Sequence, residues 1–388
     1  MNLAAAAVSP PSTPRLPGLD LLRALAIAWV MLFHSVWVGG VGPDWDGLAR
    51  FGWVGVDVFF VLSGFLIGAP LLRQLQEAPA HFSLAGFYVR RAWRILPAYL
   101  TVLAVYLAFP VLREHPNLES AWKFLSFSFN LLVDYARNPA FSHAWSLCVE
   151  EHFYLLFPLL ALGLSGRVKS WQLLALFAAL VLGGVALRGA IWQHYTALQP
   201  DRPWFIEALY YPTWSRLDAL LVGVLLAVAQ VHRPRWWAWA QHHANAVLAL
   251  GLLVLGLAWW LFRARTGLLA NTLGWPVLAA AAGLLVLAGA SPHSLIGRWR
   301  LPGVAWIAAI SYSLYLSHKL ALHAVQTWLL PWLPELAALQ FAAYVAVILL
   351  FGAALHYAVE RPGLRWRDRW PGRASSHVQP PSVAVTSR

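Results

Sequence analysis

The sequence predicts an all-α fold, a polytopic integral membrane bundle of about ten transmembrane helices. Of the 388 residues, 60% are hydrophobic and only 11% are charged, whereas charged residues make up roughly a quarter of an ordinary soluble domain. Apolar runs of about 18 or more residues, long enough to cross a bilayer, recur along the chain. The 23 tryptophans and 12 tyrosines suit the two membrane interfaces, where amphipathic rings are enriched.

Ten apolar runs are predicted to cross the bilayer, with boundaries soft by several residues. They are 19–39, 52–72, 94–112, 144–164, 171–191, 214–231, 245–262, 270–290, 304–326 and 335–359. An even number of crossings places both termini on one side of the membrane. Of the 28 basic residues, 17 fall on that side and 9 on the other, while Arg23 and Lys319 lie within spans. The positive-inside rule therefore predicts cytoplasmic termini.

The predicted membrane domain occupies residues 19–362. Residues 1–18 lack the basic and apolar regions of a signal peptide and are expected to form a flexible cytoplasmic lead. Residues 363–388 are expected to form a basic, then disordered, cytoplasmic tail. Its stretch from Arg361 to Arg373 is most simply an anchor to anionic lipids just beyond the last span. No second globular domain is expected.

The formal net charge is +12, which in a soluble protein would suggest a nucleic-acid partner. Here the basic residues follow the predicted membrane sides, so we expect membrane lipids and no nucleic acid as their partners. The single cysteine, Cys148, excludes an intramolecular disulfide and a multi-cysteine metal site. Cys148 as a thioester nucleophile is an alternative, but its apolar surroundings favour a packing role.

The first span, LDLLRALAIAWVMLFHSVWV, carries two ionisable residues, Arg23 and His34. Eleven residues make about three helical turns, so both side chains project from one face, roughly 16 Å apart. Ionisable groups inside a span are costly and usually face a cavity or a ligand path. Alternatively, Arg23 snorkels to the headgroups and His34 is a neutral imidazole that a neighbouring helix satisfies.

The second and fourth spans contain carboxylates. Asp57 lies in GWVGVDVFFVLSGFLI, where it needs a partner and the glycines are expected to permit close helix packing. In HAWSLCVEEHFYLLFP, Ser146, Glu150 and Tyr154 recur at intervals of four. A metal site of a glutamate with His152 is not expected, because adjacent helix positions point about 100° apart.

The motif FYVRRAWRILPAY places Arg91 and Arg94 at the cytoplasmic lip of the third span. Residues three apart share a helix face, and arginine forks bind phosphate in a bidentate manner. The alternative is that these arginines only obey the positive-inside rule, an explanation that applies most readily to Arg90.

Two later spans also carry polar residues. The motif WSRLDALLVG brings Arg216 and Asp218 to the head of the sixth span. In ISYSLYLSHKLALH, Tyr315 and His318 follow Ser311 in a polar stripe. A lone histidine would most simply be a satisfied core residue, and the stripe favours a function.

Together, the R-x10-H pair, GVDVFFVLSGFLI, RRAWRILPAY, WSLCVEEHFYLLFP, RLDALLVG, SYSLYLSH and HYAVERP resemble acyltransferase family 3, from about residue 18 to 363. The resemblance implies a bacterial cytoplasmic (inner) membrane enzyme. It would transfer an acyl group, commonly acetyl from acetyl-CoA, to a hydroxyl of a carbohydrate, a lipid-linked glycan or a similar acceptor. Some members carry an additional hydrolase-like domain, and without one we expect acceptor handling in the membrane domain.

The family's intramembrane arginine and histidine match Arg23 and His34, its RxxR pair matches Arg91 and Arg94, and its acidic position matches Glu150. His152 departs from the family pattern, which usually reads EEQFY where this chain reads EEHFY.

Acyl transfer to a hydroxyl needs a general base, donors for the oxyanion and a grip on the donor's phosphates. We therefore predict His34 as the base, Arg23 and Glu150 as further catalytic residues, and Arg91 with Arg94 as phosphate ligands, with no metal. The supporting residues are Asp57, Ser146, Tyr154, Arg216, Asp218, Tyr315 and His318.

An alternative function is a proton-coupled transporter or flippase, because intramembrane His, Glu and Arg also form proton relays. Paired broken helices in matching halves would favour it, and none is evident in the sequence. A purely structural scaffold leaves the buried ionisable residues without an explanation.

Overall fold

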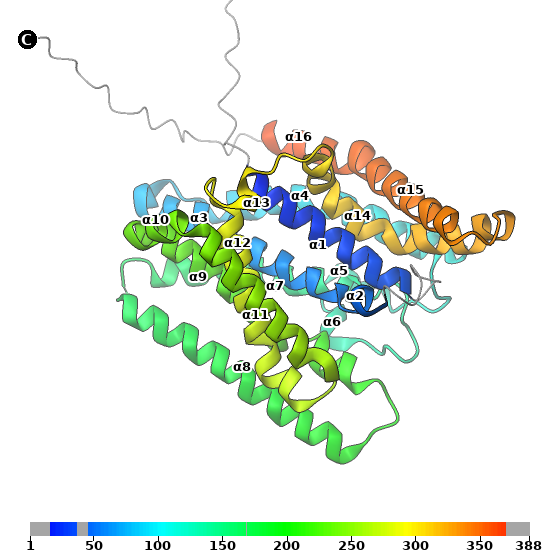
Figure 1. Ribbon diagram of the computed structural model, residues 1–388, viewed down its shortest axis with the longest axis horizontal. Coiled ribbons are helices and arrows are strands. Elements are labelled where there is room, and N and C mark those ends of the chain that lie inside the picture. Colours follow the sequence, from blue (N-terminus) through cyan, green and yellow to red (C-terminus); the bar gives the residue numbers. More distant parts are fainter. Residues whose placement is uncertain (1–15, 37–45, 168, 370–388) are drawn as a thin grey trace, which may run out of the picture.

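The computed structural model describes residues 16–36, 46–167 and 169–369, and Figure 1 shows them as a bundle of helices. No strand occurs in these ranges. The N-terminal lead through residue 15 and the tail beyond residue 369 lie outside the described residues.

Each of the ten predicted spans coincides with one long helix. These helices are α1 (Pro17–Ser35), α3 (Gly55–Glu77), α4 (Leu84–Ala108), α7 (Ala144–Leu164), α8 (Ser170–Leu198), α9 (Asp218–His232), α11 (Ala244–Leu261), α12 (Trp275–Gly289), α14 (Val304–Ala324) and α15 (Ala337–Leu355). Residues 37–39 of the first predicted span lie outside the described ranges.

Shorter elements connect the long helices. The α-helical ones are α2 (Asp46–Arg50), α5 (Ala121–Leu125), α6 (Phe129–Leu132), α10 (Pro234–His242), α13 (Leu295–Arg298) and α16 (Arg361–Arg369), and those with 3₁₀ or π geometry that matter here are η3 (Gly52–Val54), η6 (Phe205–Tyr210), η7 (Thr213–Ser215), η9 (Ala270–Gly274) and η12 (His356–Glu360).

Seven helical stretches in the described ranges are long and apolar enough to cross a membrane, which indicates an integral membrane protein. Of the other three long helices, α9 has 15 residues, and α4 and α14 carry the polar side chains of the site described below. Ten crossings and cytoplasmic termini stay predictions.

The local sequence explains where helices α1 and α4 begin. Pro17 occupies the first turn of α1, where its missing N–H costs nothing. The Ser83 hydroxyl accepts the amide of Gly86 and caps α4. Helix α4 therefore begins ten residues before the predicted span at 94. Arg91 and Arg94 lie two to three turns after the start of this helix, and their position at the cytoplasmic lip of the span stays a prediction.

Helix α3 lies at the centre and packs against α1, α7, α9 and α12. A Cβ on Gly64 would lie 2.3 Å from the Leu220 carbonyl oxygen, and one on Gly223 would lie 2.3 Å from that of Val61. Small residues therefore let α3 and α9 meet backbone to backbone, which confirms the packing interpretation for Gly64.

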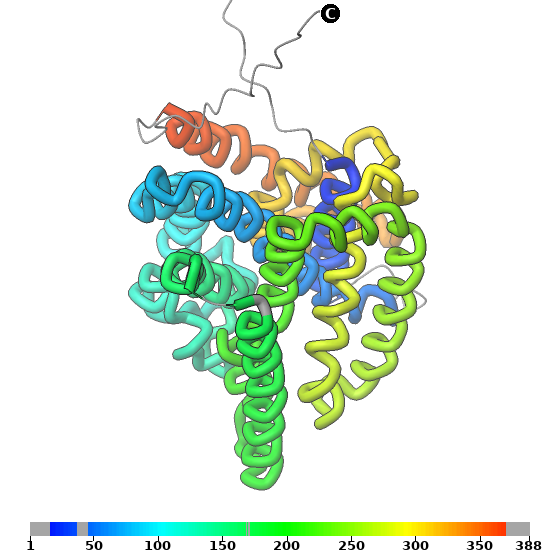
Figure 2. Tube along the Cα trace, turned by 90° about the vertical axis from the view of Figure 1, so that its left-hand side faces the viewer, coloured from blue at the N-terminus to red at the C-terminus, as the bar shows by residue number. Residues whose placement is uncertain are grey.

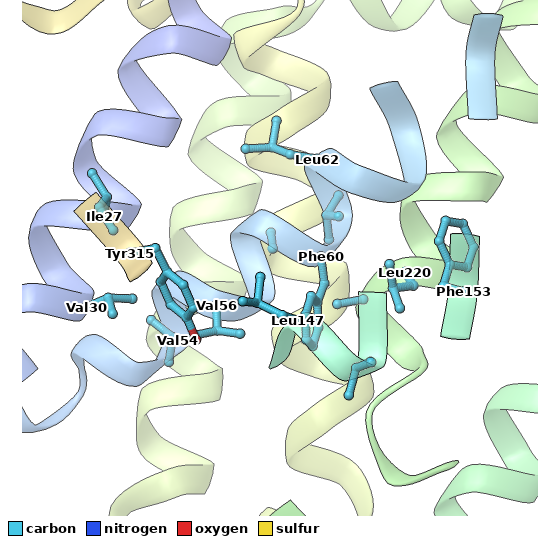
Figure 3. Packing of buried hydrophobic residues seen from close by; sticks show 14 of the residues in the cluster. Ile27, Val30, Val54, Val56, Phe60, Leu62, Leu147, Phe153, Leu220 and Tyr315 are labelled. Atoms are coloured by element: carbon cyan, nitrogen blue, oxygen red, sulfur yellow. The ribbon is translucent and has the colours of Figure 1, made fainter. Parts of the chain in front are cut away.

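A continuous apolar core joins α1, α3, α7 and α14. Figure 3 shows Ile27 and Val30 of α1 and Val56 of α3 around the ring of Tyr315, and Phe60 farther along α3. Helix α8 lies at the periphery, where its apolar side chains are largely exposed, as lipid-facing side chains would be (Figure 2). The polar residues of the candidate site lie on other helices, α1, α3, α4, α7 and α14.

Candidate functional site

A cavity of about 280 Å³ lies among α1, α3, α4, α7 and α14. Seven of the twelve predicted site residues line it, although they come from four separate helices. They are Arg23, Arg91, Arg94, Ser146, Glu150, Tyr154 and Tyr315. We call this space the inner cavity.

Glu150 is held by hydroxyl groups. The Ser63 hydroxyl donates to one carboxylate oxygen at 2.7 Å, and the Tyr154 hydroxyl donates to the other at 3.1 Å. The Arg91 guanidinium lies over the Tyr154 ring, 5.3 Å from its centroid. The four-residue spacing of Glu150 and Tyr154 thus places both on one face of α7.

Three guanidinium groups face the inner cavity, those of Arg23, Arg91 and Arg94. None of them forms an ion pair or a side-chain hydrogen bond with another described residue. The carboxylates of Glu150 and Glu151 also line this cavity, so its formal charge is an excess of one positive charge, which favours an anion there.

A second cavity of about 290 Å³, the outer cavity, adjoins the first. Both cavities are lined by Leu66, Ile67, Arg91 and Arg94, so the two arginines stand where they meet. The outer cavity is also lined by Gln74 and Arg90 and, from α16, by Arg367 and Asp368.

Two histidines meet beyond the inner cavity. His318 Nε2 lies 3.1 Å from His34 Nδ1, and the ring centroids are 4.7 Å apart. His318 Nδ1 lies 2.7 Å from the Tyr315 carbonyl oxygen, and His34 Nδ1 lies 2.9 Å from that of Val30. His318 is fully buried and His34 is half-buried.

These contacts assign the neutral tautomers. A carbonyl oxygen only accepts, so His318 Nδ1 carries its proton and His318 Nε2 is left as an acceptor. His34 Nδ1 must then be the donor to His318 Nε2, and it also points to the Val30 carbonyl. The lone pair of His34 therefore resides on Nε2, the arrangement that a general base requires.

Neither histidine lines the inner or the outer cavity. Of the residues that line the inner cavity, Tyr315 is the nearest in sequence to His318, and its hydroxyl donates to the His143 carbonyl at 2.9 Å and accepts from Ser146 at 2.6 Å. Tyr315 precedes His318 by three residues, about 5 Å along the helix axis. His318 thus lies about one helical turn from Tyr315, a lining residue of the inner cavity.

Sequence reasoning missed several residues of this region. Ser63 and Tyr312 line the inner cavity, and both stand in motifs that the sequence analysis quotes. His143 packs its ring 4.9 Å from that of His318, and its Nε2 donates to the Leu316 carbonyl at 3.1 Å. The available signal was its position directly before the AWSL turn, as a polar residue within an apolar run.

Besides His318, three predicted supporting residues lie outside both cavities. Asp57 accepts from Arg216 through both oxygens at 3.0 Å, and the Arg216 guanidinium lies 3.7 Å from the centre of a Trp275 ring. Asp218 binds Arg188 at 2.7 Å. Arg188 lies within α8 with 1% of its surface exposed.

His152 also lies apart from the cavities. Its Nδ1 contacts the Thr213 hydroxyl at 2.7 Å and so ties α7 to η7. Cys148 is fully buried and lines neither cavity. No cluster of three or more His, Cys, Asp or Glu side chains arranged to hold a metal ion occurs in the described part of the chain.

Comparisons with known proteins place this geometry in a family. A sequence model of the acyltransferase domain, family 3, matches residues 16–357. The chain belongs to the acyltransferase 3 family. The match covers every residue of the two cavities except Arg367 and Asp368.

Similar proteins in this family include three from Staphylococcus aureus. A protein of strain MRSA252, provisionally named an O-acetyltransferase, is 24% identical over 92% of this chain and 59% of its own length. Its counterpart in strain COL gives the same figures. The O-acetyltransferase OatA of strain NCTC 8325 is 32% identical over 55% of this chain and 35% of its own length. The chain thus spans less than two thirds of these relatives. No solved structure matches it.

Proposed function

We propose that this chain is an O-acetyltransferase of the bacterial cytoplasmic membrane. It takes an acyl group, acetyl in the simplest case, from acyl-CoA and transfers it to a hydroxyl of a carbohydrate or other envelope acceptor. The observation that carries the proposal is the pair of adjoining cavities, with arginines along their length and with Tyr315, a lining residue of the inner cavity, about one helical turn from His318.

The donor enters through the outer cavity. Its phosphates bind where Arg91 and Arg94 separate the two spaces, because each guanidinium offers a fork of donors and has no carboxylate partner among the described residues. The pantetheine arm then extends along the inner cavity toward Tyr315. Opening of the Tyr315–Ser146 contact admits the thioester to the histidine pair.

His34 performs the proton transfers. Its Nε2 removes the proton of the acceptor hydroxyl as the oxygen attacks the thioester carbonyl, and a tetrahedral oxyanion forms. Collapse breaks the C–S bond, and the protonated His34 returns the proton to the departing thiolate. The products are the acyl ester and coenzyme A.

The remaining polar residues prepare these steps. His318 is a positioning residue that holds the productive tautomer of His34. Arg23 supplies positive charge toward the thioester, and Glu150, fixed by Ser63 and Tyr154, orients the polar lining of the inner cavity. The hydroxyl arrives from the opposite end of α1, because His34 lies one residue before that helix ends. Donor and acceptor therefore approach the histidines from opposite faces of the membrane.

The test compares His34→Ala with Cys148→Ala in cells that lack the native gene. Ester-linked acetate released from the envelope by mild alkali reports transfer, and titration of purified protein with acetyl-CoA reports donor binding. We expect wild type and Cys148→Ala to restore the ester. His34→Ala should lose about 10²- to 10⁴-fold in transfer and keep its acetyl-CoA affinity. Wild-type protein that binds no acetyl-CoA would favour a proton-coupled transporter instead.

A further inference from the structure

The basic helix α16 packs on α4 rather than extending away from the bundle. The Trp366 ring stacks on Trp93 with centroids 6.1 Å apart. A Cβ on Gly363 would lie 3.2 Å from the Trp93 carbonyl oxygen and 3.1 Å from the Pro97 ring, so only a small residue permits this approach. Figure 2 shows α16, in red, across the same end of the bundle as the start of α4. A lipid anchor alone would need no such fit.

The packing directs one arginine of α16 into the outer cavity. Arg367 lines it together with Arg90, whereas Arg365 is exposed and lines neither cavity. Asp368 accepts from Nε and Nη2 of Arg367 at 3.0 and 2.9 Å. That contact occupies one edge of the guanidinium and leaves Nη1 without a partner in the described ranges.

Four guanidinium groups and one carboxylate therefore line the outer cavity, an excess of three positive charges. They fall into two pairs by position. Arg91 and Arg94 stand at the junction with the inner cavity, while Arg90 and Arg367 line only the outer space. A ligand that fits this pattern carries phosphate at two places, one at the junction of the two cavities and one in the outer cavity alone.

Coenzyme A has that pattern. Its pyrophosphate adjoins the pantetheine arm, and a separate phosphate is attached to the 3′ position of the ribose. With the arm in the inner cavity, the pyrophosphate lies between Arg91 and Arg94, and the 3′-phosphate lies farther out. We propose that Arg367 of α16, with Arg90, binds this 3′-phosphate and makes the protein select coenzyme A over its dephosphorylated form. The inference rests on the proposed function, which supplies acyl-CoA as the donor.

The experiment measures dissociation constants for coenzyme A and 3′-dephospho-coenzyme A by titration calorimetry. Wild type, Arg367→Gln, Arg90→Gln and the matched control Arg365→Gln are held in nanodiscs of phosphatidylcholine. We expect wild type to bind coenzyme A about tenfold to a hundredfold more tightly, the range of one or two charge-assisted hydrogen bonds. Arg367→Gln should lower that ratio to near one and leave the affinity for the dephosphorylated form unchanged within about twofold. Arg365→Gln should keep the wild-type ratio.

The outcomes separate this inference from the proposed function. If wild type binds both nucleotides equally, the 3′-phosphate site is refuted, but the proposal that acyl-CoA is the donor is retained. If wild type binds neither nucleotide, the proposal that acyl-CoA is the donor is refuted as well. Equal losses in Arg365→Gln and Arg367→Gln would reduce the effect to general surface charge and refute the site. The titrations are repeated with phosphatidylglycerol in the nanodiscs, to test whether the phosphate of a lipid headgroup binds at the same site. Loss of the preference only there would mean that lipid headgroups occupy the site.

Discussion

Buried arginines occur in two regions of this molecule, and their surroundings differ. Arg188 and Arg216 are almost completely buried, and each faces an aspartate at hydrogen-bonding distance. Arg91 and Arg94 face a cavity, and neither pairs with a carboxylate in the described part of the chain. A polar residue in an apolar helix is therefore not a site by itself. A candidate ligand-binding site is indicated instead by a charged side chain that has no carboxylate partner and faces a cavity.

The paired region holds the bundle together. Asp57 and Arg216 are separated by 159 residues and join α3 to the turn before α9. Arg188 reaches from α8 to Asp218 and to the Asn271 carbonyl. Loss of one partner leaves a buried charge uncompensated, which typically costs 3–5 kcal/mol. Arg91 and Arg94 lack such carboxylate partners, and the proposed donor phosphates would supply the missing negative charge.

The largest expected effect is on stability. Arg216→Met should lower the free energy of unfolding by about 3–5 kcal/mol, because the Asp57 carboxylate stays buried without its partner. The matched change Arg94→Met should leave it within about 1 kcal/mol of wild type, since no ion pair is lost. Thermal unfolding in detergent, followed by tryptophan fluorescence, measures both.

A control for this prediction is the double variant Asp57→Leu/Arg216→Met, which removes both charges together. It should recover most of the lost stability. Equal destabilisation by Arg216→Met and Arg94→Met would abolish the distinction between the two regions.

A smaller effect is expected at the histidine pair. His318→Leu removes the acceptor that holds the His34 tautomer, so acetyl transfer should fall roughly tenfold, with acetyl-CoA affinity unchanged. His318→Gln keeps an acceptor and should retain more activity than the leucine variant. Initial rates of ester formation at saturating donor provide the comparison. A weakened donor affinity in either variant would assign His318 to the cavity instead.

The smallest effect is expected at His152, a partnered residue outside the cavities. Its contact with Thr213 holds α7 to η7, and a glutamine also hydrogen-bonds a hydroxyl. His152→Gln should therefore keep transfer within about twofold of wild type, and the same rate assay decides. A much larger loss would show a role in the chemistry that its position does not explain.

The sequence alone predicts the helices well and the site in part. Apolar runs of sufficient length locate all ten long helices, because bilayer thickness and helix rise fix the required length. The spacing of Glu150 and Tyr154 correctly places them side by side. The apolar run that begins at residue 94 does not reveal that α4 starts ten residues earlier, at Leu84, because the arginines that precede the run make its first turns polar.

Contacts between segments that are distant in the chain cannot be predicted from local sequence patterns. That Asp57 needs a partner follows from its cost in an apolar helix, but nothing local identifies Arg216 as that partner. Arg188 and Arg367 read as ordinary basic residues near a membrane surface, and only packing of α8 and α16 gives them their surroundings. Likewise, Arg23 and His34 lie on one helix, yet the first faces the inner cavity and the second meets His318.

The most direct test of the whole account is acetyl-CoA binding by Arg91→Gln/Arg94→Gln, measured by calorimetry on protein whose melting temperature is determined alongside. The two arginines carry the donor site in this account, and each charge-assisted hydrogen bond is worth roughly 1.5–3 kcal/mol. We predict that affinity falls by two or more orders of magnitude while the melting temperature stays at the wild-type value. Unchanged affinity in the folded double variant would contradict the account, because the donor would then bind elsewhere.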